Sequence, residues 1–98
     1  MTREDVIATL RRHEPTIRRF NATALYLYGS AARDELGPDS DIDLFLDYDP
    51  AGSFSFVEFL ELQEFLSSSL RRKVDLLTRP SLHPALRARI EKSSLRVI

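Results

Sequence analysis

Two apolar segments separated by a short polar stretch constrain this chain more than any other feature of its sequence. The first segment, residues 24–28, ends at the small pair Gly29-Ser30. After ten residues, the acidic segment Asp41-Ile42-Asp43 begins the second, which continues to residue 48. Successive side chains of a strand point to opposite faces, so the two aspartates are predicted to share a face. The sequence therefore predicts one strand that ends in a flexible turn and another that carries paired carboxylates.

The acidic pair indicates a cation site. Two carboxylates about 5 Å apart repel each other by about 3 kcal/mol at an effective dielectric constant of about 20. A divalent cation between Asp41 and Asp43 would relieve this repulsion. Gly29 and Ser30 open a short helix, whose first backbone N–H groups can bind a phosphate. A metal ion beside a phosphate is the chemistry of nucleotidyl or phosphoryl transfer.

Two further residues are candidates for the same site. Asp75 lies in a third apolar segment, on the face opposite Val74 and Leu76, where an unpaired carboxylate is costly to bury. It either pairs with an arginine or, if its strand lies beside the second one in register, completes a cluster of three carboxylates. Such a cluster can hold two metal ions. Arg33, one turn into the short helix, can reach a phosphate or pair with a neighbouring acid such as Glu35.

The remaining pattern predicts an α/β (α+β) domain in which a small mixed β-sheet of three to four strands is flanked by helices. A first helix begins at Thr2, and Pro15 kinks it or splits it in two. Apolar runs and turn signals place the other elements. In chain order these are a strand 24–28, a helix 30–36, a strand 41–48, a helix 55–70, a strand 73–78, a helix 85–92 and a short edge strand 97–98.

The helix 55–70 is more apolar than one buried face requires. It begins with the capping box Ser55–Glu58 and carries eight large apolar residues, where one buried face needs about half. The surplus predicts a protein interface, or packing of the helix on two sides within the domain.

Several polar side chains have simpler interpretations. Tyr26 and Tyr28 lie in an apolar strand and are predicted to be core residues whose hydroxyl groups find partners. Asp39, Asp47 and Asp49 are predicted to be solvated charges in loops or at the end of a strand.

Composition narrows the class of protein. The length suits one domain spanning residues 1–98. The net charge of −1 gives no general attraction to nucleic acid or to a membrane, and the absence of cysteine excludes disulfides and thiolate metal sites. No apolar run is long enough to span a bilayer, and the N-terminus has no signal-peptide pattern, so a cytoplasmic location is expected.

The pair Gly29-Ser30 is followed, after ten residues, by Asp41-x-Asp43. This pattern resembles the signature of the minimal nucleotidyltransferases of the polymerase-beta superfamily. The resemblance covers most of the chain and continues to the segment around Asp75. It is greatest to the single-domain antitoxins that pair with helical HEPN-type toxins. The family usually has a glycine where this chain has Asp34, and we expect little damage from this change because aspartate tolerates a left-handed conformation better than most residues.

This resemblance implies a polymerase-beta-like nucleotidyltransferase fold and a set of roles. Asp41, Asp43 and Asp75 would bind magnesium, with two ions expected, and would be the catalytic carboxylates. Gly29, Ser30 and Arg33 would bind the nucleotide, which is expected to be ATP. The implied activity is transfer of AMP from ATP to a tyrosine of the cognate toxin, which silences it.

Size favours an acceptor supplied by another protein, because one core of this length leaves nothing to hold the acceptor. The resemblance implies that this partner is a helical HEPN-type toxin, in a homo- or hetero-oligomer, with no direct role for nucleic acid or membrane. Two alternatives remain open from the sequence. One is a non-catalytic antitoxin in which the fold is a binding module, and the other is a small-molecule nucleotidyltransferase assembled as a homodimer.

Overall fold

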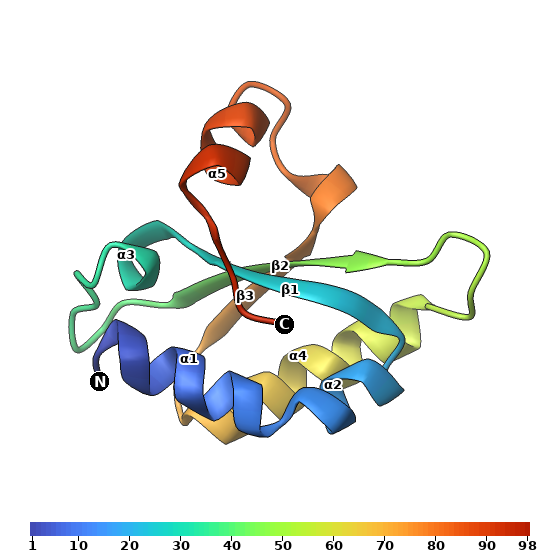
Figure 1. The fold of residues 1–98 in the computed structure, drawn as a ribbon, viewed down its shortest axis with the longest axis horizontal. Coiled ribbons are helices and arrows are strands. Elements are labelled where there is room, and N and C mark those ends of the chain that lie inside the picture. Colours follow the sequence, from blue (N-terminus) through green and yellow to red (C-terminus); the bar gives the residue numbers. More distant parts are fainter.

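The computed structural model describes residues 1–98, and it has a small mixed sheet with helices on both sides (Figure 1). The predicted α/β fold class, with a mixed sheet of four strands, is confirmed. The elements in chain order are α1 (Arg3–Arg12), α2 (Glu14–Arg19), β1 (Ala22–Tyr28), α3 (Gly29–Ala32), β2 (Ile42–Tyr48), α4 (Phe56–Leu70), β3 (Val74–Thr78), the 3-10 helix η1 (Arg79–Ser81), α5 (Arg87–Ser93) and β4 (Leu95–Arg96).

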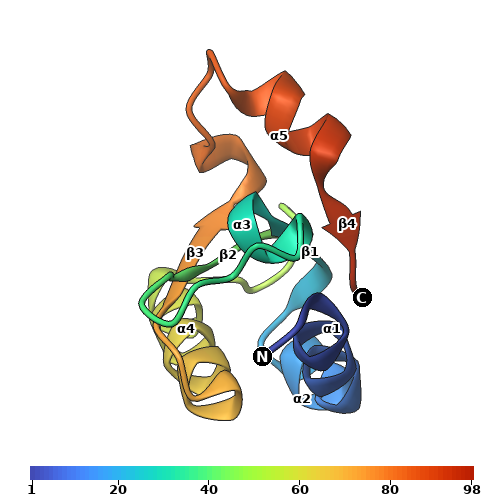
Figure 2. The ribbon, with the colours of Figure 1, turned by 90° about the vertical axis from the view of Figure 1, so that its left-hand side faces the viewer.

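The sheet has the strand order β3-β2-β1-β4. Strand β2 is antiparallel to β1 and parallel to β3, while β4 adds to the other edge of β1 in an antiparallel pair. Helices α1, α2 and α4 cover one face, and η1 and α5 stand on the opposite side (Figures 1 and 2). The second face is therefore only partly covered, and α3 lies at one end of it.

The core lies between the sheet and the layer formed by α1, α2 and α4. Alternate residues of β2 supply Ile42, Leu44 and Leu46, all with no exposed surface. They meet the buried side chains of the helices, which are Val6, Leu10, Ile17, Leu62, Leu66 and Leu70. No helix has both the length and the apolar character needed to cross a bilayer.

Helix starts agree with the capping signals in the sequence. The Thr2 hydroxyl accepts a hydrogen bond from the Asp5 amide, and the Ser55 hydroxyl accepts one from the Glu58 amide. In both cases the acidic side chain accepts in return from the amide of the capping residue, which completes a capping box. Pro15 separates α1 from α2, because proline fits the first turn of a helix but not its interior.

Several predicted boundaries were wrong. Asp41 precedes β2 instead of beginning it, and α3 ends at Ala32, four residues before the predicted end at Leu36. The last helix spans Arg87–Ser93 instead of 85–92. The edge strand is Leu95–Arg96, although the next two residues still exchange backbone hydrogen bonds with Leu25. These ends depend on long-range pairing, which local sequence signals do not report.

Candidate active site

Pairing of the three central strands brings the main candidate residues together. Asp43 lies opposite Tyr28 in the antiparallel pair β1–β2 and opposite Asp75 in the parallel pair β2–β3. Residues at paired positions project from the same face of a sheet. Asp43 is partly buried between its two neighbours, whereas Asp75 is exposed at the edge strand. The structure thus has the β2–β3 register on which the proposed grouping of Asp43 with Asp75 depends.

Gly29 makes room for the Asp43 carboxylate. It has a φ of +70°, a left-handed conformation that residues with a side chain rarely adopt. A Cβ atom on Gly29 would collide with the Oδ2 atom of Asp43. The strand-to-helix turn and the carboxylate therefore fit each other only if residue 29 has no side chain.

Several negative charges lie close together at this end of the sheet. Partial burial and the carboxylates of Asp75 and Asp41 raise the pKa of Asp43 above its ordinary value. Burial, together with the charges of Asp43 and Asp75, also raises the pKa of the Tyr28 hydroxyl to about 12. Tyr28 was predicted to lie in the core, but it borders the acidic group instead. A bound cation would lower the electrostatic free energy of this group.

Asp41 lies near Asp43 and Asp75 but forms an ion pair with a lysine. Its Oδ2 atom lies 3.8 Å from Nζ of Lys73, an exposed ion pair that carries little stability. In the side-chain conformations of the structure, no three His, Cys, Asp or Glu side chains are gathered closely enough to hold one metal ion. The metal ligands therefore stay a prediction, and Lys73 is a neighbour that the sequence did not single out.

The remaining predicted site residues lie around α3. Ser30 is in the first turn of this helix, where the leading amides have no partner within the helix. Arg33 pairs with Glu35 at 3.5 Å, which is the alternative role foreseen for it, yet its charge still acts to lower the pKa of Asp43. Asp34 has a φ of 58°, a left-handed conformation that aspartate tolerates better than most residues.

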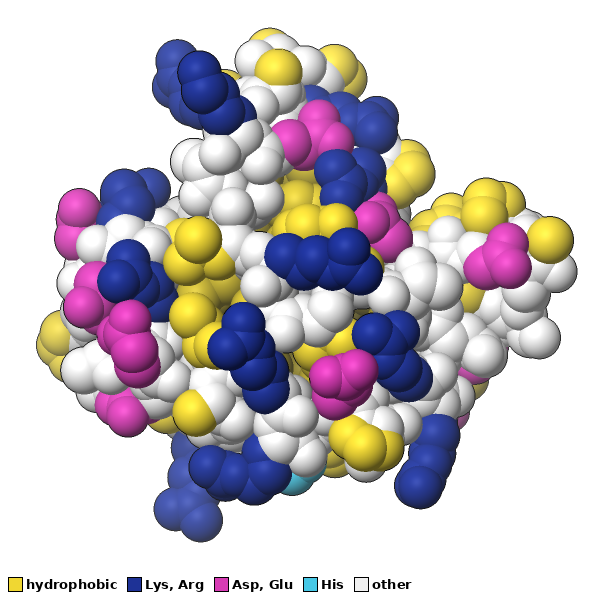
Figure 3. Space-filling model, viewed as in Figure 1, with side chains coloured by type: hydrophobic (Ala, Val, Ile, Leu, Met, Phe, Trp, Pro, Cys, Tyr) yellow, Lys and Arg dark blue, Asp and Glu magenta, His cyan; other side chains and the backbone are white.

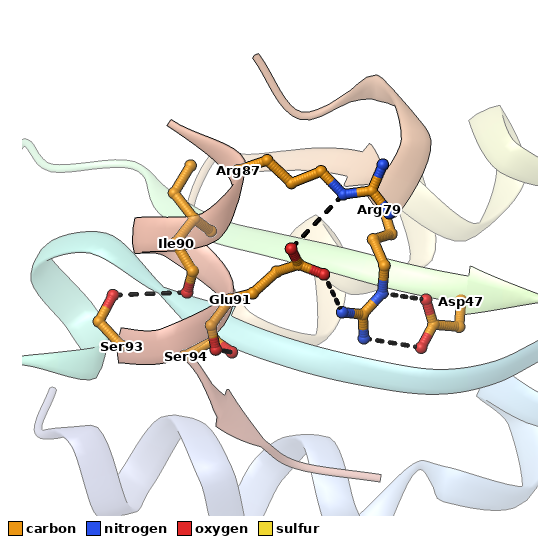
Figure 4. A network of polar contacts seen from close by, with 7 residues as sticks. All are labelled: Asp47, Arg79, Arg87, Ile90, Glu91, Ser93 and Ser94. Carbon is orange, nitrogen blue, oxygen red and sulfur yellow. Dashed lines mark hydrogen bonds and ion pairs between the residues drawn. The ribbon is translucent and has the colours of Figure 1, made fainter. Parts of the chain in front are cut away.

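A second cluster occupies the other end of the same face (Figure 4). Asp47 was predicted to be a solvated charge, but Arg79 of η1 binds both its oxygens, with distances of 2.7 and 3.0 Å. Arg79 also pairs with Glu91 of α5, and its guanidinium lies over the rings of Tyr26 and Phe45. Those rings stack on each other, so Tyr26 lines the open face and is not part of the core.

Figure 3 shows acidic side chains at the end of the molecule that carries α3, with Lys and Arg side chains among them, and charges of both signs over the rest of this view. The arrangement of a glycine turn, a free helix start and uncompensated carboxylates can hold a metal-bound phosphate.

Residues 10–98 match the nucleotidyltransferase domain family. The chain belongs to this family. The predicted identification as a nucleotidyltransferase is thereby confirmed, and so is its class as an enzyme.

Relatives of this nucleotidyltransferase cover nearly its whole length. A protein of Methanocaldococcus jannaschii, named as a candidate protein adenylyltransferase, is 36% identical over 98 residues, which is 98% of each chain. The protein adenylyltransferase MntA of Thermococcus cleftensis is 34% identical over 83 residues, covering 84% of this chain and 82% of the relative.

Solved structures agree with the fold of this nucleotidyltransferase. A protein described as a candidate minimal nucleotidyltransferase superposes with a TM-score of 0.74 at 26% identity, over 91% of this chain and 93% of the other. An MNT antitoxin in a complex with a tri-AMPylated Shewanella oneidensis HEPN toxin superposes with a TM-score of 0.58 at 23% identity, over 98% and 68%.

Proposed function

We propose that this nucleotidyltransferase is a magnesium-dependent protein adenylyltransferase and the antitoxin of a toxin–antitoxin pair. Its substrate would be ATP, and its acceptor a tyrosine hydroxyl of a helical HEPN-type partner. The observation that carries the proposal is the position of Asp43, in register with Asp75 and packed against Gly29, where neighbouring carboxylates and partial burial raise its pKa. The names of the relatives and the AMPylated toxin in a structural neighbour support this choice of reaction.

The donor set fits magnesium. Hard divalent cations prefer carboxylate oxygens; Asp43 and Asp75 offer these at paired positions, and the Asp41 carboxylate lies near enough to raise the pKa of Asp43. Magnesium bound there would activate the attacking hydroxyl and neutralise charge on the departing pyrophosphate. The elevated pKa of Asp43 supports the proposal, because a cation would replace a proton at this crowded position.

The chain's own residues would position the nucleotide. The leading amides of α3, from Gly29 and Ser30, would donate to phosphate oxygens. Arg33 would add a positive charge near the same phosphates once it leaves Glu35. The tyrosine oxygen of the acceptor would then attack the α-phosphorus in line, so that its O–P bond forms while the bond to pyrophosphate breaks and the phenolic proton passes to the Asp75 carboxylate.

An apolar surface on α4 supports a protein acceptor. Three of the eight apolar residues in this helix are exposed, namely Phe56 at 73%, Val57 at 60% and Leu60 at 47%. The other five pack within the domain. The apolar residues beyond those needed for one buried face therefore lie in the first half of the helix. An exposed apolar group of this kind favours contact with another protein.

The test is intact-mass spectrometry of a HEPN-type toxin after its co-expression with this chain. The wild type should add AMP to that protein, and the double variant Asp41→Ala/Asp43→Ala should leave it unmodified. Asp49→Asn, which changes an exposed loop carboxylate, is the matched control and should behave as the wild type. A stable complex without any adduct would support the binding-module alternative instead.

A further inference from the structure

The segment that delivers Asp41 and Asp43 to the site is a tight turn between α3 and β2. The Ser40 amide donates to the Gly37 carbonyl at 3.3 Å, and the Gly37 amide donates to the Ser40 hydroxyl oxygen at 3.2 Å. Asp41 follows this turn directly and lies outside the sheet. The position of its carboxylate therefore depends on how firmly the turn is held.

Arg72 holds this turn from the opposite side. Its Nη2 atom donates to the Ser40 carbonyl at 2.8 Å and also to the Gly37 carbonyl. One guanidinium nitrogen thus binds the first and last carbonyls of the turn. Arg72 is partly buried, which strengthens both charge-assisted bonds.

The backbone around Arg72 is fixed by the end of α4. Arg71 ends the helix in a left-handed conformation with a φ of 54°, and the Arg72 amide then donates to the Ser67 carbonyl. The next carbonyl, of Lys73, accepts from the Ile42 amide at 2.9 Å. The segment that begins β3 is therefore joined to the start of β2 by both side-chain and backbone bonds.

We propose that Arg72 is the positioning residue of the acidic site. It fixes the turn 37–40, and through it the placement of Asp41 and the register in which Asp43 faces Asp75. Residues that orient metal ligands from behind are typically worth tenfold to a hundredfold in metal affinity. The effect on metal binding rests on the proposed function, whereas the effect on the turn does not.

Hydrogen exchange measures the turn directly. In Arg72→Met, amides of a peptide spanning residues 36–44 should exchange about tenfold faster than in the wild type, because the turn loses both side-chain bonds. Arg72→Lys keeps a donor at the same position and should restore part of the protection. Peptides from β1 and α1 should keep their wild-type rates in both variants.

Arg11→Met is the matched control. Arg11 also donates from its side chain to a backbone carbonyl, that of Val97 at 3.2 Å, but at the far edge of the sheet. It should leave exchange in residues 36–44 unchanged. If Arg72→Met exchanges like the wild type there, or speeds exchange equally in all peptides, Arg72 does not position the turn.

A metal-binding measurement tests whether the turn affects the site. Electron paramagnetic resonance can monitor the binding of Mn²⁺ in the presence of a non-hydrolysable ATP analogue. The apparent Kd for Mn²⁺ should rise about tenfold in Arg72→Met and stay unchanged in Arg11→Met. Equal Kd values for wild type and Arg72→Met would overturn the positioning role. If the wild type itself binds no Mn²⁺, the proposed function fails, and exchange in residues 36–44 still decides whether Arg72 holds the turn.

Discussion

Asp43 and Asp47 lie on the same face of β2 and have opposite surroundings. Asp47 is gripped by Arg79 through two hydrogen bonds, and these bonds hold the pKa of its carboxyl below the ordinary value. Asp43 has no such partner, and burial together with two neighbouring carboxylates raises its pKa. One strand thus carries a neutralised carboxylate and an uncompensated one. The difference separates an acid used to hold the fold together from an acid available for a ligand.

The two ends also differ in what covers them. At the Asp47 end, Arg79 connects β2 to Glu91 and thereby fastens α5, a helix with no buried residue, to the sheet (Figure 4). At the Asp43 end, the neighbouring helix α3 is only four residues long and begins at Gly29, which packs against the Asp43 carboxylate. The Asp47 end is thus held by a network of ion pairs, whereas the Asp43 end has crowded carboxylates.

The largest expected effect comes from removing the two acids at the candidate metal site. Asp41→Ala/Asp43→Ala should lower the rate of AMP transfer by about a thousandfold, because loss of a bound metal costs about 4 kcal/mol of transition-state stabilisation. Asp47→Asn should keep the wild-type rate. Rates come from single-turnover assays with labelled ATP and the purified partner. If the double variant and Asp47→Asn lost AMP-transfer rate equally, the carboxylates at the two ends of β2 would not differ in function.

The next effect concerns the space that Asp43 occupies. Gly29→Ala should lower the free energy of unfolding by about 3 kcal/mol, because a side chain at a positive φ is strained and would collide with the carboxylate. Urea denaturation followed by circular dichroism measures this loss. The double variant Gly29→Ala/Asp43→Ala should recover part of the stability. No recovery would mean that backbone strain alone is responsible.

Breaking the closed end should have a smaller effect, on stability rather than on chemistry. Arg79→Met leaves Asp47 and Glu91 unpaired and removes the cation from the Tyr26 and Phe45 rings. The free energy of unfolding should fall by about 2 kcal/mol in urea denaturation. Arg87→Met, which removes a more exposed contact to Glu91, is the control and should cost less. A loss as small as the control's would show that Arg79 contributes no more than a surface ion pair.

The smallest effect is on the pH dependence of stability, and its sign differs between the two acids. The folded pKa of Asp43 is raised above its ordinary value of 3.8, so its stabilising contribution is present below 3.8 and is lost as the pH rises through the folded value. Asp43→Asn should therefore be slightly more stable than the wild type at pH 7, by less than about 1 kcal/mol since the group is partly solvated.

Asp47 shows the reverse. Its folded pKa lies below 3.8, so its contribution is present above 3.8 and is lost as the pH falls through the folded value. Asp47→Asn should be less stable than the wild type at pH 7, and this difference should shrink in acid. Thermal melts of the wild type and both variants from pH 3 to pH 7, without divalent cations, test the two signs. The same sign for both variants would contradict the comparison.

Much of the fold was readable from local signals, and much of the site was not. The capping boxes at Thr2 and Ser55, the break at Pro15 and the apolar strands all follow from short-range chemistry, and the structure confirms them. Asp43 and Asp75 were found because strand periodicity assigns their faces.

What the sequence missed depends on residues far apart in the chain. Arg79 reaches Asp47 and Arg72 reaches Ser40, each across a separation of 32 residues, and neither spacing has a local signature. The position of Tyr28 was misjudged for a related reason. The apolar sequence of β1 predicted a strand buried on both faces, whereas only one face of the sheet is fully covered.

Tyr28 gives the protein a built-in optical probe. The chain has no tryptophan and only three tyrosines, and one of these borders the acidic group. A cation that binds beside Asp43 would offset the negative charge that helps to raise the pKa of Tyr28 to about 12. The ultraviolet absorbance of its phenolate would then appear at lower pH. The absorbance of Tyr28 would thus respond to a cation beside Asp43 without any added label.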